Sequence, residues 1–325
     1  MSMKYTPHDE LFKHVMGHPE TAKNFIREYL PEDIVDKVDL SHFQDKTEKY
    51  TDEKMDEYRT DLVFNTRLEE GQDAYFYFLF EHKSSPDRNT VFQLLRYMTL
   101  IWEKAFEEEE EYPVILPILF YHGESVWSYG ESLDEILTNI PGWADDFTPY
   151  FDYQVYETHK SEKESDDPLF KAYTLLLEAA QLYDEQARIV NAMRKALKFF
   201  DKAVEKFNIS EEFEYVFRYI IAAIDLPPHL MQKIVNQEVP ERREEFMAMA
   251  EKLREEGRKE GKKEGSQDTL NLMKETIKKM KNKFGSDKTI DLVLEIEDSD
   301  VKKLEEINTA IEKADSVEEL KEMIR

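Results

Sequence analysis

Two carboxylates and a lysine lie in neighbouring strand-like segments of the sequence. Asp61 falls within residues 59–68, and Glu81 and Lys83 close the aromatic segment 73–83. Side chains alternate along a strand, so Glu81 and Lys83 project to the same face. Paired carboxylates and a backbone carbonyl suit Mg²⁺, with Mn²⁺ or Ca²⁺ as substitutes, and a nearby lysine can orient an attacking water. The pattern predicts metal-assisted hydrolysis of a phosphodiester bond.

The same residues also permit a purely structural interpretation. Six apolar residues precede Glu81 without a turn residue, so its carboxylate should be partly buried. A buried carboxylate needs a charged partner or a metal ion. An ion pair between Lys83 and either Glu81 or Asp61 would satisfy the edge of the sheet without any catalysis. The residue pattern alone leaves both interpretations open.

Several other residues are candidates for supporting roles. The backbone carbonyl of His82 lies between the two charged residues and is a candidate metal ligand. Gln93 and Arg96, three residues apart on a predicted helix, are candidates to reach the site or a phosphate. His8 and Asp9 either cap the first helix or add a water-mediated metal contact.

The surrounding pattern predicts a mixed α/β core that positions these residues. Two short helices within residues 8–30 precede strands at 59–68 and 73–83, where Gly71 marks the turn. Apolar residues recur at helical spacing over about 89–110, and strands follow at 113–121 and 153–156. A helix that joins two such strands is a crossover connection, so the 89–110 helix should lie across the sheet.

Four regions follow from the changes of pattern along the chain. We expect a nuclease-like core over residues 1–165, helices packed on it over 166–240, a charged Glu-Gly repeat over 241–265 and a small helical module over 266–325. The repeat places Gly257, Gly261 and Gly265 four residues apart. It is either a flexible connector or a helix whose bare stripe admits a partner helix.

Composition limits the classes of protein to which the chain can belong. The absence of cysteine excludes disulfides, Cys-based zinc sites and thiol nucleophiles. No apolar run is long enough to cross a membrane, so we expect a cytoplasmic protein. The formal net charge of −27 opposes non-specific attraction to DNA and predicts weak, salt-sensitive binding.

Five stretches, in order, resemble the recombination-promoting nuclease family, also labelled putative transposases, of the PD-(D/E)XK superfamily. They are HDELFKHVM, RTDLVF, FYFLFEHKSSPD, FQLLRYM with IWEKAF, and VILPILFYHGESVW. The resemblance implies a restriction-endonuclease-like core in which Asp61, Glu81 and Lys83 match the motif positions. Thr60 stands where the superfamily commonly has proline, and Lys83 where many relatives of this family have glutamine.

The expected function is therefore Mg²⁺-dependent cleavage of DNA, in recombination or the biology of mobile elements. The alternative is a non-catalytic scaffold of nuclease fold that acts through protein–protein interaction. A transposase with three separated acidic ligands ranks last, because a lysine follows the two carboxylates on the same strand. Double-strand cleavage calls for two active centres, which predicts a homodimer formed through the helical C-terminal half.

Overall fold

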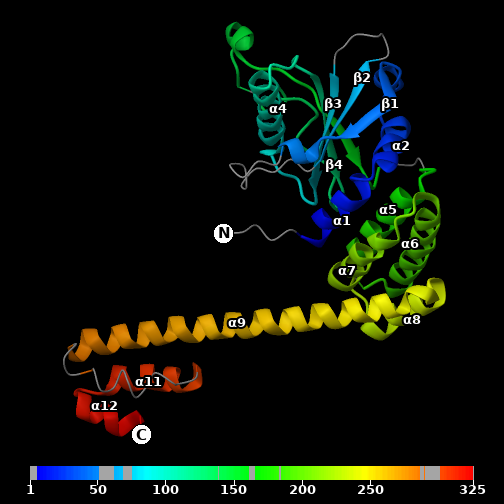
Figure 1. Ribbon diagram of the computed structural model, residues 1–325. Helices are drawn as coiled ribbons and strands as arrows, with labels where there is room; N and C mark the ends of the chain where they lie inside the picture. Colours follow the sequence, from blue (N-terminus) through cyan, green and yellow to red (C-terminus); the bar gives the residue numbers. More distant parts are fainter. Residues whose placement is uncertain are drawn as a thin grey trace. The chain divides into compact units, whose positions relative to one another are not determined.

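The computed structural model divides into two compact units, Met1–Ala250 and Glu251–Arg325. It describes residues 6–50, 62–68, 75–137, 139–160, 165–182, 184–285, 289 and 301–324. The first unit contains the sheet and the second is helical in its described part (Figure 1). The mixed α/β class, with a mostly helical C-terminal half, is as expected from the sequence.

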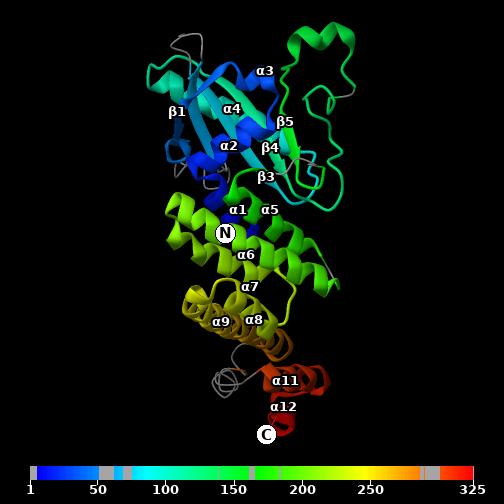
Figure 2. The same cartoon turned by 90° about the vertical axis from the view of Figure 1, so that its right-hand side faces the viewer.

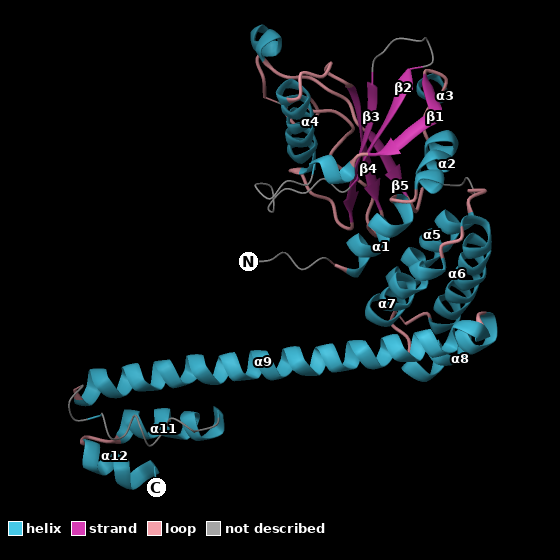
Figure 3. Cartoon of the chain, in the orientation of Figure 1, coloured by secondary structure: helices cyan, strands magenta, loops and turns pink. Residues whose placement is uncertain are grey.

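A five-stranded mixed sheet forms the centre of the first unit (Figure 3). The strands are β1 (Val38–Asp45), β2 (Leu62–Leu68), β3 (Tyr75–Lys83), β4 (Val114–Tyr121) and β5 (Gln154–Glu157). They lie in the order β1-β2-β3-β4-β5. The first three pair antiparallel, whereas β3 with β4 and β4 with β5 pair parallel. Strands at the positions of β2, β3, β4 and β5 were predicted from the sequence, whereas β1 was not.

Helix α4 (Thr90–Glu107) is the crossover between β3 and β4 and covers one face of the sheet. Its apolar stripe, including Leu94 and Ile101, packs with Leu119 and Tyr121 of β4 in one buried cluster. This burial stabilises the helix more than intrinsic propensity does, because most helices in proteins owe their stability to packing of an amphipathic face. The predicted crossover helix is confirmed.

Helices α1 (Pro7–Met16), α2 (Pro19–Tyr29) and α3 (Glu32–Val35) precede the sheet, and Figure 1 shows α2 and α4 on opposite sides of it. An aromatic core fills the α2 side, where Phe25 lies 5.7 Å from Phe80 and 5.5 Å from Phe170 between ring centroids. The residues of α1 and α2 therefore bury the face of the sheet that α4 leaves open.

The helices that follow the sheet in the first unit are α5 (Pro168–Gln181), α6 (Gln186–Phe207), α7 (Phe213–Ala223) and α8 (Pro228–Glu238), and the unit ends within the first turns of α9. Helix α5 packs along α6, and α1 contacts both α5 and α7 (Figure 2). Asp167 caps α5 by accepting hydrogen bonds from the backbone N–H groups of Leu169 and Phe170. It also accepts one from Asn24 Nδ2 at 2.8 Å, which ties α5 to α2.

Helix α9 (Arg243–Phe284) runs through the Glu-Gly repeat. Of the two interpretations of the repeat, a flexible connector or a helix, the structure shows the helix. A Cβ atom added to Gly257 would meet no atom within 4 Å, so this glycine faces open space. In the second unit, α11 (Val301–Lys313) and α12 (Val317–Ile324) share a small core with the end of α9. Among the described residues, no helix is both long and apolar enough to cross a membrane.

Candidate functional site

Glu81 and Lys83 lie at the C-terminal end of β3 and share one face of the sheet. Glu81 pairs in register with Leu119, and Lys83 pairs with Tyr121. Partners in register point to the same side, and Leu119 and Tyr121 pack against α4. The two charged side chains therefore lie on the face that α4 covers.

The two side chains form an ion pair, with Lys83 Nζ 3.1 Å from Glu81 Oε1. Glu81 is only 4% exposed, whereas the side chain of Lys83 is 20% exposed. A carboxylate buried to this extent needs a compensating charge, which Lys83 supplies. The geometry is the one expected both for a hydrolytic site and for a structural ion pair at the sheet edge.

Asp61, the other carboxylate predicted from the sequence, lies outside the described residues. The described strand β2 begins at the next residue, Leu62, which pairs in register with Phe80. Phe80 is in turn the residue before Glu81. The antiparallel register between β2 and β3 is thus defined up to the positions that immediately adjoin both carboxylates in the sequence.

Gln93 and Arg96, the predicted supporting residues, lie on α4 and hence on the helix that covers the Glu81 face. The side-chain oxygen Oε1 of Gln93 is buried and has no hydrogen-bond partner within the described part of the chain. A buried carbonyl oxygen in this state is costly to keep, so a donor at this position would be favourable. Arg96 is exposed.

His82, between the two charged residues, turns its side chain to the opposite face of the sheet. Its Nδ1 lies 3.1 Å from Asp9 Oδ1 and its Nε2 lies 3.4 Å from the hydroxyl of Tyr173. Asp9 also completes a capping box with Thr6 at the start of α1. The structure therefore brings Asp9 to His82 and not to the Glu81–Lys83 pair, and the cap residue of α1 is Thr6.

The hydrogen bonds of Asp9 determine its charge. Burial alone would raise the pKa of this carboxyl, but hydrogen bonds from His82 and Thr6 outweigh burial and hold the pKa well below its usual range. Asp9 is consequently a fixed negative charge beside the buried imidazole of His82. Its contacts with Thr6 and His82 hold the start of α1 next to the end of β3.

Three histidines from distant parts of the sequence form a cluster on this second face: His8, His82 and His122. The ring of His122 stacks on His82 at 4.6 Å and lies 4.9 Å from His8 between centroids. His8 Nδ1 lies 3.0 Å from the hydroxyl of Tyr219 on α7. The sequence analysis did not find this cluster. Its one local signal was a histidine directly after the buried strand β4.

His122 is the most buried member of the histidine cluster, at 2% exposure. Neither ring nitrogen has a hydrogen-bond partner among the described residues. Burial, reinforced by the neighbouring charges of His82 and His8, lowers the pKa of His122 to about 2. The ring is therefore neutral at physiological pH and behaves as part of the aromatic core.

Gly123 follows His122 directly after β4, where the backbone comes close to the end of β3. A Cβ atom at position 123 would overlap the ring of Tyr121 and would lie 2.8 Å from the backbone oxygen of Ser84. No larger residue fits without displacing the ends of β3 and β4. Glycine here keeps the segment after β4 close to the end of β3, where Lys83 accepts a hydrogen bond from the backbone of His122 at 3.0 Å.

Oxygen atoms of Glu81 and of the His82 backbone are the candidate ligands for a divalent cation at the site. Mg²⁺ prefers oxygen ligands, and Glu81 and the His82 carbonyl are of that kind. Across the described residues no group of three or more histidine or acidic side chains is arranged to hold a metal ion. The described residues thus supply one carboxylate and one carbonyl ligand for a metal ion. A second carboxylate would have to come from outside the described residues.

Comparison with known proteins relates most of the first unit to one family. Recombination-promoting nuclease RpnD of Escherichia coli O157:H7 is 35% identical over 120 residues, which cover 36% of this chain but only 46% of RpnD. RpnA of E. coli K12 is 25% identical over 261 residues, covering 78% of this chain and 85% of RpnA. RpnE of the same strain, named an inactive recombination-promoting nuclease-like protein, is 26% identical over 261 residues and 83% of its length.

No solved structure matches the chain. The model of the family described as putative transposase, YhgA-like, matches residues 6–211, which include the entire sheet and the helices α1 to α6. The chain therefore belongs to the YhgA-like putative transposase family.

Proposed function

We propose that this protein is a metal-dependent DNA endonuclease whose active centre contains Glu81, Lys83 and Asp61. The observation that carries the proposal is the buried Glu81 carboxylate with the Lys83 ammonium 3.1 Å away, on one face at the end of β3. The names of RpnD and RpnA, which are recombination-promoting nucleases, support it. A role in recombination or element mobility is part of the proposal.

In this proposal, Asp61, Glu81 and the His82 carbonyl would hold Mg²⁺, with Mn²⁺ or Ca²⁺ as substitutes. The chemistry supplied by such an ion is activation of water and neutralisation of charge on the phosphate. Support for the second carboxylate comes from the register, since Leu62 and Phe80 pair and adjoin Asp61 and Glu81 in sequence.

Lys83 would change partners during the reaction. In the described geometry its ammonium neutralises Glu81. A cation held by Glu81 would supply the positive charge in place of Lys83, and Lys83 would then orient the attacking water and offset the charge of the scissile phosphate. Its partial exposure gives it access to substrate that the more buried Glu81 lacks.

Cleavage of supercoiled plasmid at low salt tests the proposal. We expect nicking or linearisation with Mg²⁺ or Mn²⁺, none with EDTA, and a loss of at least about 100-fold in Glu81→Gln and Asp61→Ala. Glu103→Gln is the matched control, because Glu103 is an exposed carboxylate on α4. Unchanged cleavage by purified, folded Asp61→Ala protein would contradict the assignment.

A second candidate function is a non-catalytic scaffold of the same fold. Two relatives, RpnE and YjiP, carry names that call them inactive, and a closed Glu81–Lys83 pair is also what a structural role requires. Thermal unfolding with metal separates the two candidates. A true carboxylate site gains stability with millimolar Mg²⁺ or Mn²⁺ by an amount set by its affinity, whereas a scaffold does not.

A further inference from the structure

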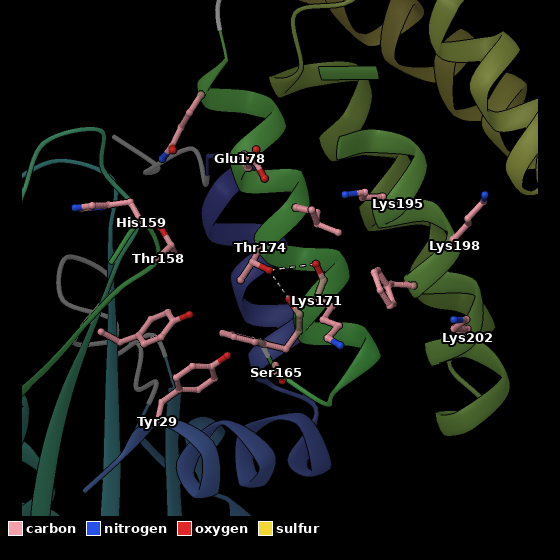
Figure 4. Close-up of a pocket in the computed structure, with 15 residues that line it drawn as sticks. Tyr29, Thr158, His159, Ser165, Lys171, Thr174, Glu178, Lys195, Lys198 and Lys202 are labelled. Carbon is pink, nitrogen blue, oxygen red and sulfur yellow. Dashed lines mark hydrogen bonds between the residues drawn. The ribbon is translucent and has the colours of Figure 1, made fainter. Parts of the chain in front are cut away.

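A pocket of about 660 Å³ opens between β5 and helices α2, α5 and α6, within the first unit (Figure 4). It lies on the face of the sheet opposite to the Glu81–Lys83 pair. Tyr156 of its lining pairs in register with Phe120, which pairs with His82. Those residues occupy the histidine side of the sheet, so the pocket is separate from the candidate catalytic centre.

Aromatic side chains line one end of the pocket. The rings of Tyr29 and Tyr156 meet edge to face with centroids 4.8 Å apart. Phe170 supports both rings at 5.5 Å and 5.9 Å and is itself only 1% exposed. This end therefore offers rigid aromatic surface to a flat ligand group.

Lysines line the other end of the pocket. The ammonium groups of Lys171 on α5 and Lys202 on α6 each lie 5.3 Å from the centroid of the Phe199 ring. Lys195, two helical turns before Lys202, also lines the pocket, and Figure 4 shows its side chain directed towards α5. Three positive charges thus gather around one cavity in a chain whose formal net charge is −27.

These three lysines have no acidic partner among the described residues, in contrast to the fourth lysine of the lining. Lys198 pairs with Glu238 at 3.2 Å and points away from the cavity in Figure 4. Glu178, which is the carboxylate among the described lining residues, lies 3.9 Å from Arg188. Positive charges that line one cavity attract an anion to it.

We propose that this pocket binds a nucleotide, with the base against Tyr29 and Tyr156 and the phosphates at Lys171, Lys195 and Lys202. Inorganic phosphate would use only the lysines, and a neutral aromatic compound would use only the tyrosines. A ligand with a flat ring at one end and phosphate at the other uses both. The inference goes beyond the proposed nuclease function and does not depend on it.

The same chemistry is present in a free nucleotide and in the phosphorylated end of a nucleic acid strand. Calorimetric titration of the full chain in EDTA distinguishes them, because no cleavage can occur. The probes are the adenosine, guanosine, cytidine and thymidine 5′-mono- and triphosphates, a short 5′-phosphorylated oligothymidylate and inorganic pyrophosphate. Tighter binding of the oligonucleotide than of the thymidine nucleotides assigns the site to a strand end, and the reverse assigns it to a free nucleotide.

Two pairs of substitutions test the location of the site. Lys171→Gln with Lys202→Gln should weaken nucleotide binding by about 10- to 100-fold, because each removes a charge-assisted contact to phosphate. Lys206→Gln with Lys233→Gln changes the net charge equally at exposed positions outside the pocket lining and should leave affinity unchanged. Equal affinities in the two double variants would overturn the proposal.

A third variant tests the aromatic end. Tyr29→Leu should weaken nucleotide binding by about tenfold and leave pyrophosphate binding unaltered, since base stacking on an aromatic side chain is lost. Pyrophosphate binding as tight as that of the best nucleotide would also overturn the proposal, as would a failure of every nucleotide and of the oligonucleotide to bind. The Glu81→Gln variant should bind nucleotides normally, so failure of this proposal is distinguishable from failure of the proposed nuclease function.

Discussion

His82 and its two neighbours in β3, Glu81 and Lys83, have different environments on the two faces of the sheet. Glu81 and Lys83 form a charged pair on one face, and His82 joins Asp9 and an aromatic cluster on the other. The imidazole thus anchors the strand end while the flanking charges remain on the α4 side. Substitution of His82 would disturb the backbone carbonyl that the proposed site uses, whereas substitution of His122 would not do so directly.

The buried ring of His122 should make stability depend on pH. Its pKa in the folded protein is about 2, against 6.5 for a free histidine, so the unfolded chain binds an additional proton between these values. Stability from this group is complete above about pH 6.5 and is lost as pH falls through the window down to about pH 2. We expect the unfolding free energy to fall by about 1 kcal/mol per pH unit below pH 6.5 from this residue alone.

His122→Phe keeps an aromatic ring in the stack and removes the proton. Urea unfolding at about pH 7.5 and about pH 5 should show a smaller loss of stability in the variant than in the wild type. His229→Phe, at a position where the imidazole is not among the buried groups, serves as the control and should keep the wild-type slope. Identical slopes in all three proteins would contradict the neutral, buried state of His122.

At the scale of elements, the candidate site lies on β3, which is the central strand of the sheet. β2 and β4 pair with it on either side, and α4 and α1 cover its two faces. A central strand of this kind holds its terminal side chains with little freedom, which suits a site that must place charge accurately. Its last residues, Glu81 to Lys83, remain paired in register with β4 to the end.

Gly257 within α9 and Gly285 directly after it should respond in opposite ways to substitution by alanine. Gly257 lies within the helix facing open space, so Gly257→Ala should stabilise the helix by about 1 kcal/mol. Gly285 follows the last helical residue with a φ of 89°, a conformation that favours glycine, so Gly285→Ala should destabilise it by about 1 kcal/mol. Urea unfolding followed by far-ultraviolet circular dichroism measures both changes.

The two variants serve as controls for each other, because each replaces one glycine with alanine, one inside α9 and one directly after it. Stabilisation by both would mean that the residue after α9 does not adopt the left-handed conformation. Destabilisation by Gly257→Ala would mean that the repeat is packed against another surface in solution. A homodimer formed along the Gly257 stripe would give that result.

At the scale of the whole molecule, the proposed nuclease would have one active centre per chain. A single centre cuts one strand, so double-strand cleavage predicts a homodimer, and we place its interface in the helical C-terminal half. Analytical ultracentrifugation should give twice the chain mass of 38.7 kDa. A monomer that only nicks plasmid would be consistent with the nuclease but would contradict the dimer. A monomer that linearises plasmid in a single encounter would contradict both the homodimer and the premise that one active centre cuts one strand.

Local patterns in the sequence were sufficient to predict many of the helices and strands of the first unit. Helical spacing of apolar residues predicted α4, and uninterrupted apolar runs predicted β3 and β4. The alternation of side chains along a strand also placed Glu81 and Lys83 on one face. These predictions hold because periodicity depends only on neighbouring residues and on the geometry of a single helix or strand.

β1 could not be predicted in the same way, because its burial pattern is irregular and its register with β2 shifts between Asp39 and Gln44. Such an edge strand is defined by its pairing partner and not by its own periodicity. The Glu-Gly repeat likewise admitted two interpretations, since glycine opposes a helix locally while the flanking residues favour one.

The sequence by itself determined the main elements, the charged pair at the end of β3 and the likeness to a nuclease family. Only the tertiary structure decided that His8, His82 and His122 stack together, and that lysines of α5 and α6 share a pocket with Tyr29 and Tyr156. His8 and Tyr219, whose side chains lie 3.0 Å apart, are separated by 211 positions in the chain. Contacts over such separations depend on how helices pack against the sheet, and no local periodicity encodes that packing.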